Sequence, residues 1–130
     1  MTNIMKYHEF NESATYINSE GEKKKVCYLA MEIVKGVELI EFISECEDLD
    51  DSTIRYIFKK VATAINLLHK AGIAHRDVKL ENIMITEDFD IKLIDLGYAI
   101  ALEGRTGSSF LKSRLGTNMY LAPEIIDKTL

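Results

Sequence analysis

The residues best suited to chemistry lie in one short polar segment, HRDVKLEN, at positions 75–82. Asp77 is followed two residues later by Lys79 and five residues later by Asn82, and a further carboxylate, Asp95, comes after the apolar run IKLI. Phosphoryl transfer needs an acceptor for the hydroxyl proton, cations around the phosphoryl oxygens and ligands for Mg²⁺. Carboxylate and amide oxygens bind Mg²⁺, a carboxylate accepts a proton, and a lysine neutralises charge, so these residue types at this spacing predict phosphoryl transfer.

Four segments resemble the signature motifs of protein kinases. HRDVKLEN resembles the catalytic loop, DLG at 95–97 the metal-binding motif usually written D-F-G, and APE at 122–124 the end of the activation loop. MEIVKGVE at 31–38 resembles the hinge, and all four follow the family order. Leu96 replaces the usual Phe and, being apolar, can fill the same internal position. The resemblance implies an α/β (α+β) fold of the protein-kinase type.

The resemblance also implies a serine/threonine kinase that uses ATP and Mg²⁺. Asp77 then corresponds to the catalytic base and Lys79 to the lysine that reaches the transferred phosphate. Asn82 and Asp95 correspond to the two metal ligands. Lys79 at this spacing, together with the pair Gly-Thr that ends at Thr117, is typical of kinases that phosphorylate serine and threonine of protein substrates.

The position of ATP follows from the same resemblance. Met31 corresponds to the gatekeeper, and the backbone of Glu32 and Val34 would hydrogen-bond adenine. Glu38 would contact the ribose, and Met84 would lie under the adenine ring. Ordinary core packing is a second interpretation of the two methionines, since this side chain fills irregular gaps.

Substrate binding and regulation concern three further residues. Thr117 would line the groove for the polypeptide substrate. Ser113, three residues before Gly116, matches the activating phosphosite of many serine/threonine kinases. Arg76 directly precedes Asp77, and its guanidinium could hold a phosphate on Ser113 through two hydrogen bonds. His75 is expected to act in packing and hydrogen bonding, with no role in proton transfer.

The elements that would position these residues are read from periodicity and turn residues. Residues 4–17 and 26–34 predict an antiparallel hairpin around the turn-forming stretch 18–21. Residues 38–43 predict a short helix, and the acidic stretch 44–51 a solvated connection. Residues 83–85 and 91–94 predict a second, smaller hairpin, and 98–122 a long functional loop. We divide the chain into a small-lobe hairpin, 1–34, and the start of a large lobe, 35–130.

One long amphipathic helix is predicted over residues 52–71. Asp51 or Ser52 would cap its start and Gly72 would end it. Its apolar residues recur at steps of three and four and predict a single stripe that faces the core: Ile54, Ile57, Phe58, Val61, Ala64, Ile65 and Leu68.

Composition excludes several other classes of protein. The 130 residues are 47% apolar and 28% charged, and the net charge of −5 argues against nucleic-acid or anionic-membrane partners. No apolar run approaches the roughly 20 residues of a membrane span. Cys27 and Cys46 match no metal-ligand spacing, and an intracellular, cytoplasmic setting is expected.

The resemblance covers only part of a kinase domain, which leaves alternatives open. The sequence contains no Gly-rich phosphate loop and no V-A-I-K-type lysine, so we expect the chain alone to be weakly active or inactive. A pseudokinase-like fragment that binds a partner is the second interpretation. A small-molecule phosphotransferase is the third, and Lys79 with the GT…APE segment argues against it. The protein substrate, subfamily and oligomeric state are not predicted.

Overall fold

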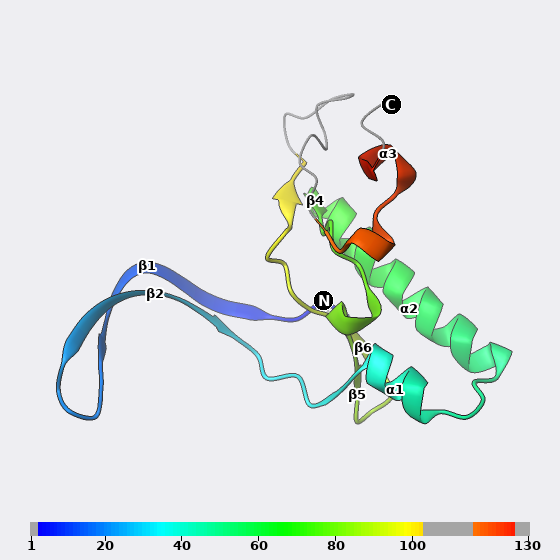
Figure 1. The fold of residues 1–130 in the computed structure, drawn as a ribbon, viewed down its shortest axis with the longest axis horizontal. Coiled ribbons are helices and arrows are strands. Elements are labelled where there is room, and N and C mark those ends of the chain that lie inside the picture. Colours follow the sequence, from blue (N-terminus) through cyan, green and yellow to red (C-terminus); the bar gives the residue numbers. More distant parts are fainter. Residues whose placement is uncertain (1–2, 103–115, 127–130) are drawn as a thin grey trace.

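The computed structural model describes residues 3–102 and 116–126. Figure 1 shows a long two-stranded hairpin that extends away from the helices and small sheets formed by the rest of the chain. The hairpin consists of β1 (Tyr7–Ile17) and β2 (Lys23–Met31), paired antiparallel. Its turn is closed by the Asn18 side chain, whose Oδ1 accepts hydrogen bonds from the amides of Glu20 and Glu22 at 3.0 and 2.9 Å. The predicted hairpin is confirmed, with strand ends shifted by about three residues.

A three-stranded sheet forms the centre of the molecule. Its strands, in the order β3-β5-β6, are β3 (Gly36–Glu38), β5 (Ile83–Thr86) and β6 (Ile91–Leu93). Residues 3–5 extend this sheet beyond β6, because Leu93 exchanges backbone hydrogen bonds with Asn3 and Met5, each of 2.9 Å. The predicted small hairpin is confirmed as β5 and β6.

Strand β3 was not predicted from the sequence, where Gly36 reads as a break. Gly36 instead permits the pairing, because a Cβ at this position would lie 2.0 Å from the carbonyl oxygen of Ile85. Its φ of +156° is also a backbone conformation that residues with side chains rarely adopt.

Two helices follow β3. They are α1 (Leu39–Glu45) and α2 (Asp51–Lys70), and the acidic stretch connects them as predicted. The predicted N-cap of α2 is wrong by one or two residues: Asp50 caps the helix, its carboxylate accepting from the Thr53 amide at 3.0 Å. Gly72, with φ +71°, follows the last turn as predicted.

The core lies between α2 and the sheet. From α2 it contains Ile57, Ala64 and Leu68, with Val61 and Ile65 packed at its edge. The prediction that the whole apolar stripe is buried is wrong at two positions, since Ile54 is 50% and Phe58 73% exposed. The sheet contributes Ile83, Ile85, Ile91 and Leu93, and Ile4 and Leu39 complete the core.

Short elements flank the central sheet. Strand β4 (Ile73–Ala74) pairs with β7 (Ile100–Ala101), and the 3-10 helix η1 (Leu80–Asn82) precedes β5. A second 3-10 helix, η3 (Asn118–Tyr120), and α3 (Pro123–Ile126) follow. The predicted loop 98–122 therefore contains a strand and a helical turn within its described residues. No helix among the described residues has the length and apolarity to cross a bilayer.

Candidate active site

The predicted catalytic segment runs from β4 to β5, and Asp77 lies at its centre. Its side chain is buried, with 5% of the residue exposed. The carboxylate forms an ion pair with the Lys79 ammonium at 3.1 Å and accepts a hydrogen bond from the Asn82 amide at 3.0 Å. The Asn82 amide also donates to the Asp77 carbonyl oxygen at 2.8 Å. The three residues that the sequence singled out are therefore in direct contact.

Thr117 reaches the same carboxylate from 40 residues further along the chain. Its amide and its hydroxyl each donate to Asp77 Oδ1 at 3.0 Å, and its hydroxyl also accepts from Lys79 Nζ at 2.9 Å. Gly116 makes this approach possible, because a Cβ there would lie 3.0 Å from the Arg76 carbonyl oxygen. The glycine and threonine that the sequence marked as a pair thus close the site together.

His75 is buried beside Asp77 and contacts the backbone on both sides of the site. It is 2% exposed, its Nδ1 accepts from the Asp77 amide at 3.2 Å, and its Nε2 lies 3.0 Å from the Ile94 carbonyl oxygen. This arrangement assigns the ring proton to Nε2, since Nδ1 acts as an acceptor. The expected structural role of His75 fits these contacts, which fix the Asp77 backbone relative to strand β6.

The charge on the site depends on a balance of burial and hydrogen bonding. Burial tends to raise the pKa of the Asp77 carboxyl, but hydrogen bonds from Lys79 and Thr117 outweigh it and lower the pKa overall. The hydrogen bond to Asp77 raises the pKa of Lys79. At neutral pH the site therefore holds an ionised carboxylate and an ammonium group.

The two predicted metal ligands differ in environment. Asn82 is buried and donates both amide hydrogens to Asp77, so its Oδ1 remains as the available oxygen. Asp95 is exposed on the turn after β6, where its Oδ1 accepts from the Gly97 amide at 2.9 Å. Its φ of +58° is uncommon for a residue with a side chain. One amide oxygen and one carboxylate suit Mg²⁺, which takes few protein ligands and keeps several waters.

Comparison with known proteins agrees with this geometry. The family description "Protein kinase domain" matches residues 1–130. The chain belongs to the protein kinase family. It is 39% identical over 99 residues to serine/threonine-protein kinase cds1 of Schizosaccharomyces pombe, an alignment that covers 76% of this chain and 21% of that protein.

Other relatives carry similar names. The chain is 35% identical over 126 residues to CBL-interacting serine/threonine-protein kinase 7 of Arabidopsis thaliana, covering 97% of this chain and 27% of that protein. It is 45% identical over 92 residues to the PAS domain-containing serine/threonine-protein kinase of Mus musculus, covering 70% of this chain and 6% of that protein. The chain thus spans about a quarter or less of the length of these kinases.

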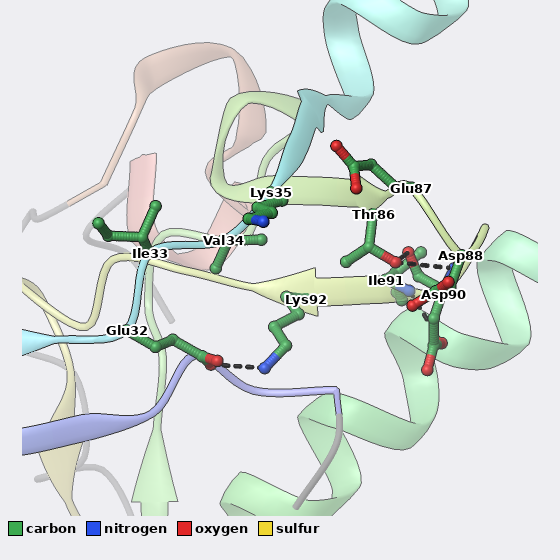
Figure 2. A pocket seen from close by; sticks show the side chains of 10 residues that line it. All are labelled: Glu32, Ile33, Val34, Lys35, Thr86, Glu87, Asp88, Asp90, Ile91 and Lys92. Carbon is green, nitrogen blue, oxygen red and sulfur yellow. Dashed lines mark hydrogen bonds and ion pairs between the residues drawn. The ribbon is translucent and has the colours of Figure 1, made fainter.

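The residues predicted to contact ATP are spread over three places in this kinase segment. Met31 lines an apolar cavity of about 450 Å³ together with Asp95. Glu32 and Val34 line a separate cavity of about 390 Å³, shown in Figure 2, where the Glu32 carboxylate pairs with Lys92 at 2.5 Å. The other two, Glu38 and Met84, are direct partners in the β3–β5 register.

Two backbone groups of the predicted hinge have no hydrogen-bond partner among the described residues. The Glu32 amide donates to the Lys6 carbonyl at 2.9 Å, so only its carbonyl remains for adenine. Within the described residues the Val34 amide has no hydrogen-bond acceptor. A free carbonyl and a free amide are what adenine recognition at Glu32 and Val34 needs, and that role stays a prediction.

The residues predicted for regulation are described only in part. The Arg76 guanidinium Nε donates to the Tyr98 carbonyl at 2.6 Å, and Arg76 has a φ of +67°. Ser113 lies outside the described residues. The expected contact between Arg76 and a phosphate on Ser113 therefore stays a prediction.

One residue that contacts the Asp95 turn was not predicted from the sequence. Tyr7, at the start of β1, accepts a hydrogen bond from the Leu96 amide through its hydroxyl at 3.1 Å. Nothing in the local pattern marks it, because a tyrosine in a strand is common and its partner lies 89 residues away.

Proposed function

We propose that this chain supplies the catalytic and metal-binding residues of a protein serine/threonine kinase, which transfers the γ-phosphate of ATP to hydroxyl groups of proteins. The observation that carries the proposal is the pairing of the Asp77 carboxylate with Lys79, Asn82 and Thr117. A buried carboxylate with three partners of these types is costly to assemble and is the arrangement that phosphoryl transfer uses.

Each group has one task in this reaction. Asp77, kept ionised by its partners, orients the substrate hydroxyl and accepts its proton as the phosphoryl group arrives. Lys79 neutralises negative charge that spreads over the phosphoryl oxygens. Asn82 Oδ1 and the Asp95 carboxylate would hold Mg²⁺, which supplies charge neutralisation for the phosphates when bound.

Thr117 links this chemistry to the substrate. Its hydroxyl bridges Lys79 and Asp77, so it fixes the distance between the base and the cation before a substrate enters. Held groups need no reorganisation at the moment of reaction, and positioning supplies most of the rate in phosphoryl transfer.

The test compares Asp77→Asn with Asp48→Asn in the complete polypeptide that carries residues 1–130. Asp48 lies exposed in the connection between α1 and α2 and provides the same change of side chain away from the site. Transfer of radiolabelled γ-phosphate to a protein substrate is measured for both variants. Loss of a positioned base costs about 10²–10⁴-fold in rate, and we expect that loss only for Asp77→Asn.

Two results would contradict the proposal. Equal rates in the Asp77→Asn variant and the unmodified protein would remove Asp77 from the reaction. A polypeptide that binds a partner but neither ATP nor Mg²⁺ would favour the pseudokinase interpretation.

A further inference from the structure

The turn that carries Asp95 is held at few points. The Ile94 amide donates to the Asn82 carbonyl at 2.9 Å, and the Leu96 carbonyl accepts from the Ala99 amide at 3.0 Å. Between these two contacts the backbone passes through Asp95 in the left-handed region, at φ +58°. Such a conformation costs energy in a residue with a side chain and persists only where neighbouring contacts fix it.

The Ile94 carbonyl precedes Asp95 and lies 3.0 Å from His75 Nε2, and the Leu96 amide follows Asp95 directly along the backbone. The acceptor of the Leu96 amide comes from the hairpin. The Tyr7 hydroxyl accepts this hydrogen bond at 3.1 Å across 89 residues of sequence. Within the described residues no other side chain of β1 or β2 hydrogen-bonds to residues 95–97. Figure 1 shows the hairpin leaving the rest of the molecule from this end of β1.

The ring of Tyr7 also has a defined place. Together with Met31, Leu29 and Leu96 it lines the apolar cavity of about 450 Å³. Tyr7 therefore lies among apolar side chains, and its hydroxyl accepts from the Leu96 amide. An amide in such surroundings needs an acceptor, because an unpaired backbone donor away from water is unfavourable.

We propose that Tyr7 is a positioning residue for Asp95: its hydroxyl accepts the Leu96 amide and so holds the Asp95 carboxylate where it can bind the metal–nucleotide complex. This inference rests on the proposed kinase function. Tyr7 touches neither metal nor substrate and acts through the backbone of the 95–97 turn. The Leu96 side chain is free to fill the cavity, since only its amide is used.

The experiment compares Tyr7→Phe with Tyr16→Phe in the complete polypeptide. Tyr16 lies on the same strand, is 57% exposed and makes no hydrogen bond through its hydroxyl in the described structure, so it is the matched control. The first measurement is amide hydrogen exchange at Leu96, with Ile94 as an internal reference. We expect faster exchange at Leu96 in Tyr7→Phe alone, and unchanged exchange at Ile94 because its acceptor on Asn82 remains.

The second measurement is ATP binding over a series of MgCl₂ concentrations. Loss of one hydrogen bond of ordinary strength should raise the Mg²⁺ concentration for half-maximal binding by about 2-fold to 12-fold in Tyr7→Phe. Binding of ATP without Mg²⁺ should not change. A purely structural role for the tyrosine would lower both kinds of binding together, so the difference between them identifies positioning.

The outcomes separate this inference from the function on which it rests. Unmodified protein that binds no ATP at any Mg²⁺ concentration would contradict the proposed function. Normal Mg²⁺ dependence in Tyr7→Phe, with or without faster Leu96 exchange, would overturn the role of Tyr7 and leave the function intact. If Tyr7→Phe fails to fold, a ring-fluorinated tyrosine at position 7 replaces it, because this residue keeps the packing and weakens the hydroxyl as a hydrogen-bond acceptor. We then expect a smaller increase in the Mg²⁺ concentration for half-maximal ATP binding.

Discussion

Residues 7–31 and residues 73–97 are equally long, yet the chain uses them in opposite ways. The first segment is the β1–β2 hairpin, in which the two strands pair antiparallel over most of their length and no side chain is buried. The second contains the predicted catalytic loop and consists of short strands, a 3-10 helix and loops, yet His75, Asp77 and Asn82 are almost completely buried. Long regular strands and buried polar side chains therefore occur in different regions of this protein.

The comparison of the hairpin with residues 73–97 shows which contacts stabilise the folded protein. A two-stranded hairpin without a covered face is marginal in water, because backbone pairing alone contributes little net free energy. The predicted catalytic loop is held by long-range side-chain contacts, which join it to Ile94 directly after β6 and to Thr117. Phe10, Tyr16 and Ile17 are each more than half exposed on the hairpin.

The largest expected effect on stability contrasts two isoleucines. Ile91 in β6 is 1% exposed, and Ile91→Ala should lower the free energy of unfolding by about 2–5 kcal/mol, because it removes buried apolar surface and leaves a cavity. Ile17 in β1 is 55% exposed, and Ile17→Ala should change stability by less than about 0.5 kcal/mol. Urea denaturation followed by circular dichroism measures both. Losses of equal size would show that the hairpin is part of the same core.

A smaller effect contrasts two asparagines. Asn82→Ala removes both hydrogen bonds that the buried amide donates to Asp77. Lys79 and Thr117 still contact the carboxylate, but the Asp77 carbonyl oxygen loses its partner among the described residues, which should cost about 1–3 kcal/mol. Asn11 in the hairpin accepts from the exposed Ser13 amide at 2.9 Å, and Asn11→Ala should cost less than about 0.5 kcal/mol. Both are measured by thermal unfolding without metal. A negligible loss for Asn82→Ala would mean that water replaces its contacts to Asp77.

The smallest expected effect is in pH dependence, and it has opposite signs in the two regions. Although burial opposes it, hydrogen bonding from Lys79 and Thr117 lowers the pKa of Asp77 in the folded state. This contribution to stability is present above the unfolded pKa of about 3.9 and is lost as pH falls through the folded pKa. A hydrogen bond to Glu9 raises the pKa of Tyr28 in the hairpin. That contribution is present below the unfolded pKa of about 10 and is lost as pH rises through the folded pKa.

The measurement is the free energy of unfolding across both pH ranges in two variants. Asp77→Asn should flatten the acid limb, and it should also change the alkaline limb, because Lys79 loses the partner that raises its pKa. Tyr28→Phe should flatten the alkaline limb. An unchanged acid limb in Asp77→Asn would show that the hydrogen bonds to the Asp77 carboxylate do not stabilise the folded state.

Local patterns predicted the elements better than their ends. The 3.6-residue periodicity of 52–71 predicts helix α2 because a helix repeats its contacts within a few residues. The N-cap was predicted at the wrong residue because Asp50, Asp51 and Ser52 are adjacent and all three side chains can cap a helix. Only the backbone conformation, which is extended at Asp50 and helical from Asp51, decides among them. Strand β3 was missed because Gly36 reads as a break until the carbonyl of Ile85 is known to lie against it.

The sequence by itself determined the family, the order of the motifs and the types of side chain at Asp77, Lys79, Asn82 and Asp95. It could do so because these residues lie close together along the chain or in fixed motifs. Only the tertiary structure decided that Ile54 and Phe58 face solvent, that Thr117 completes the Asp77 site and that Tyr7 supports the Asp95 turn. The contact between Tyr7 and Leu96 spans 89 residues. Periodicity describes only neighbouring residues along the chain, whereas the packing of one element on another determines which distant residues meet.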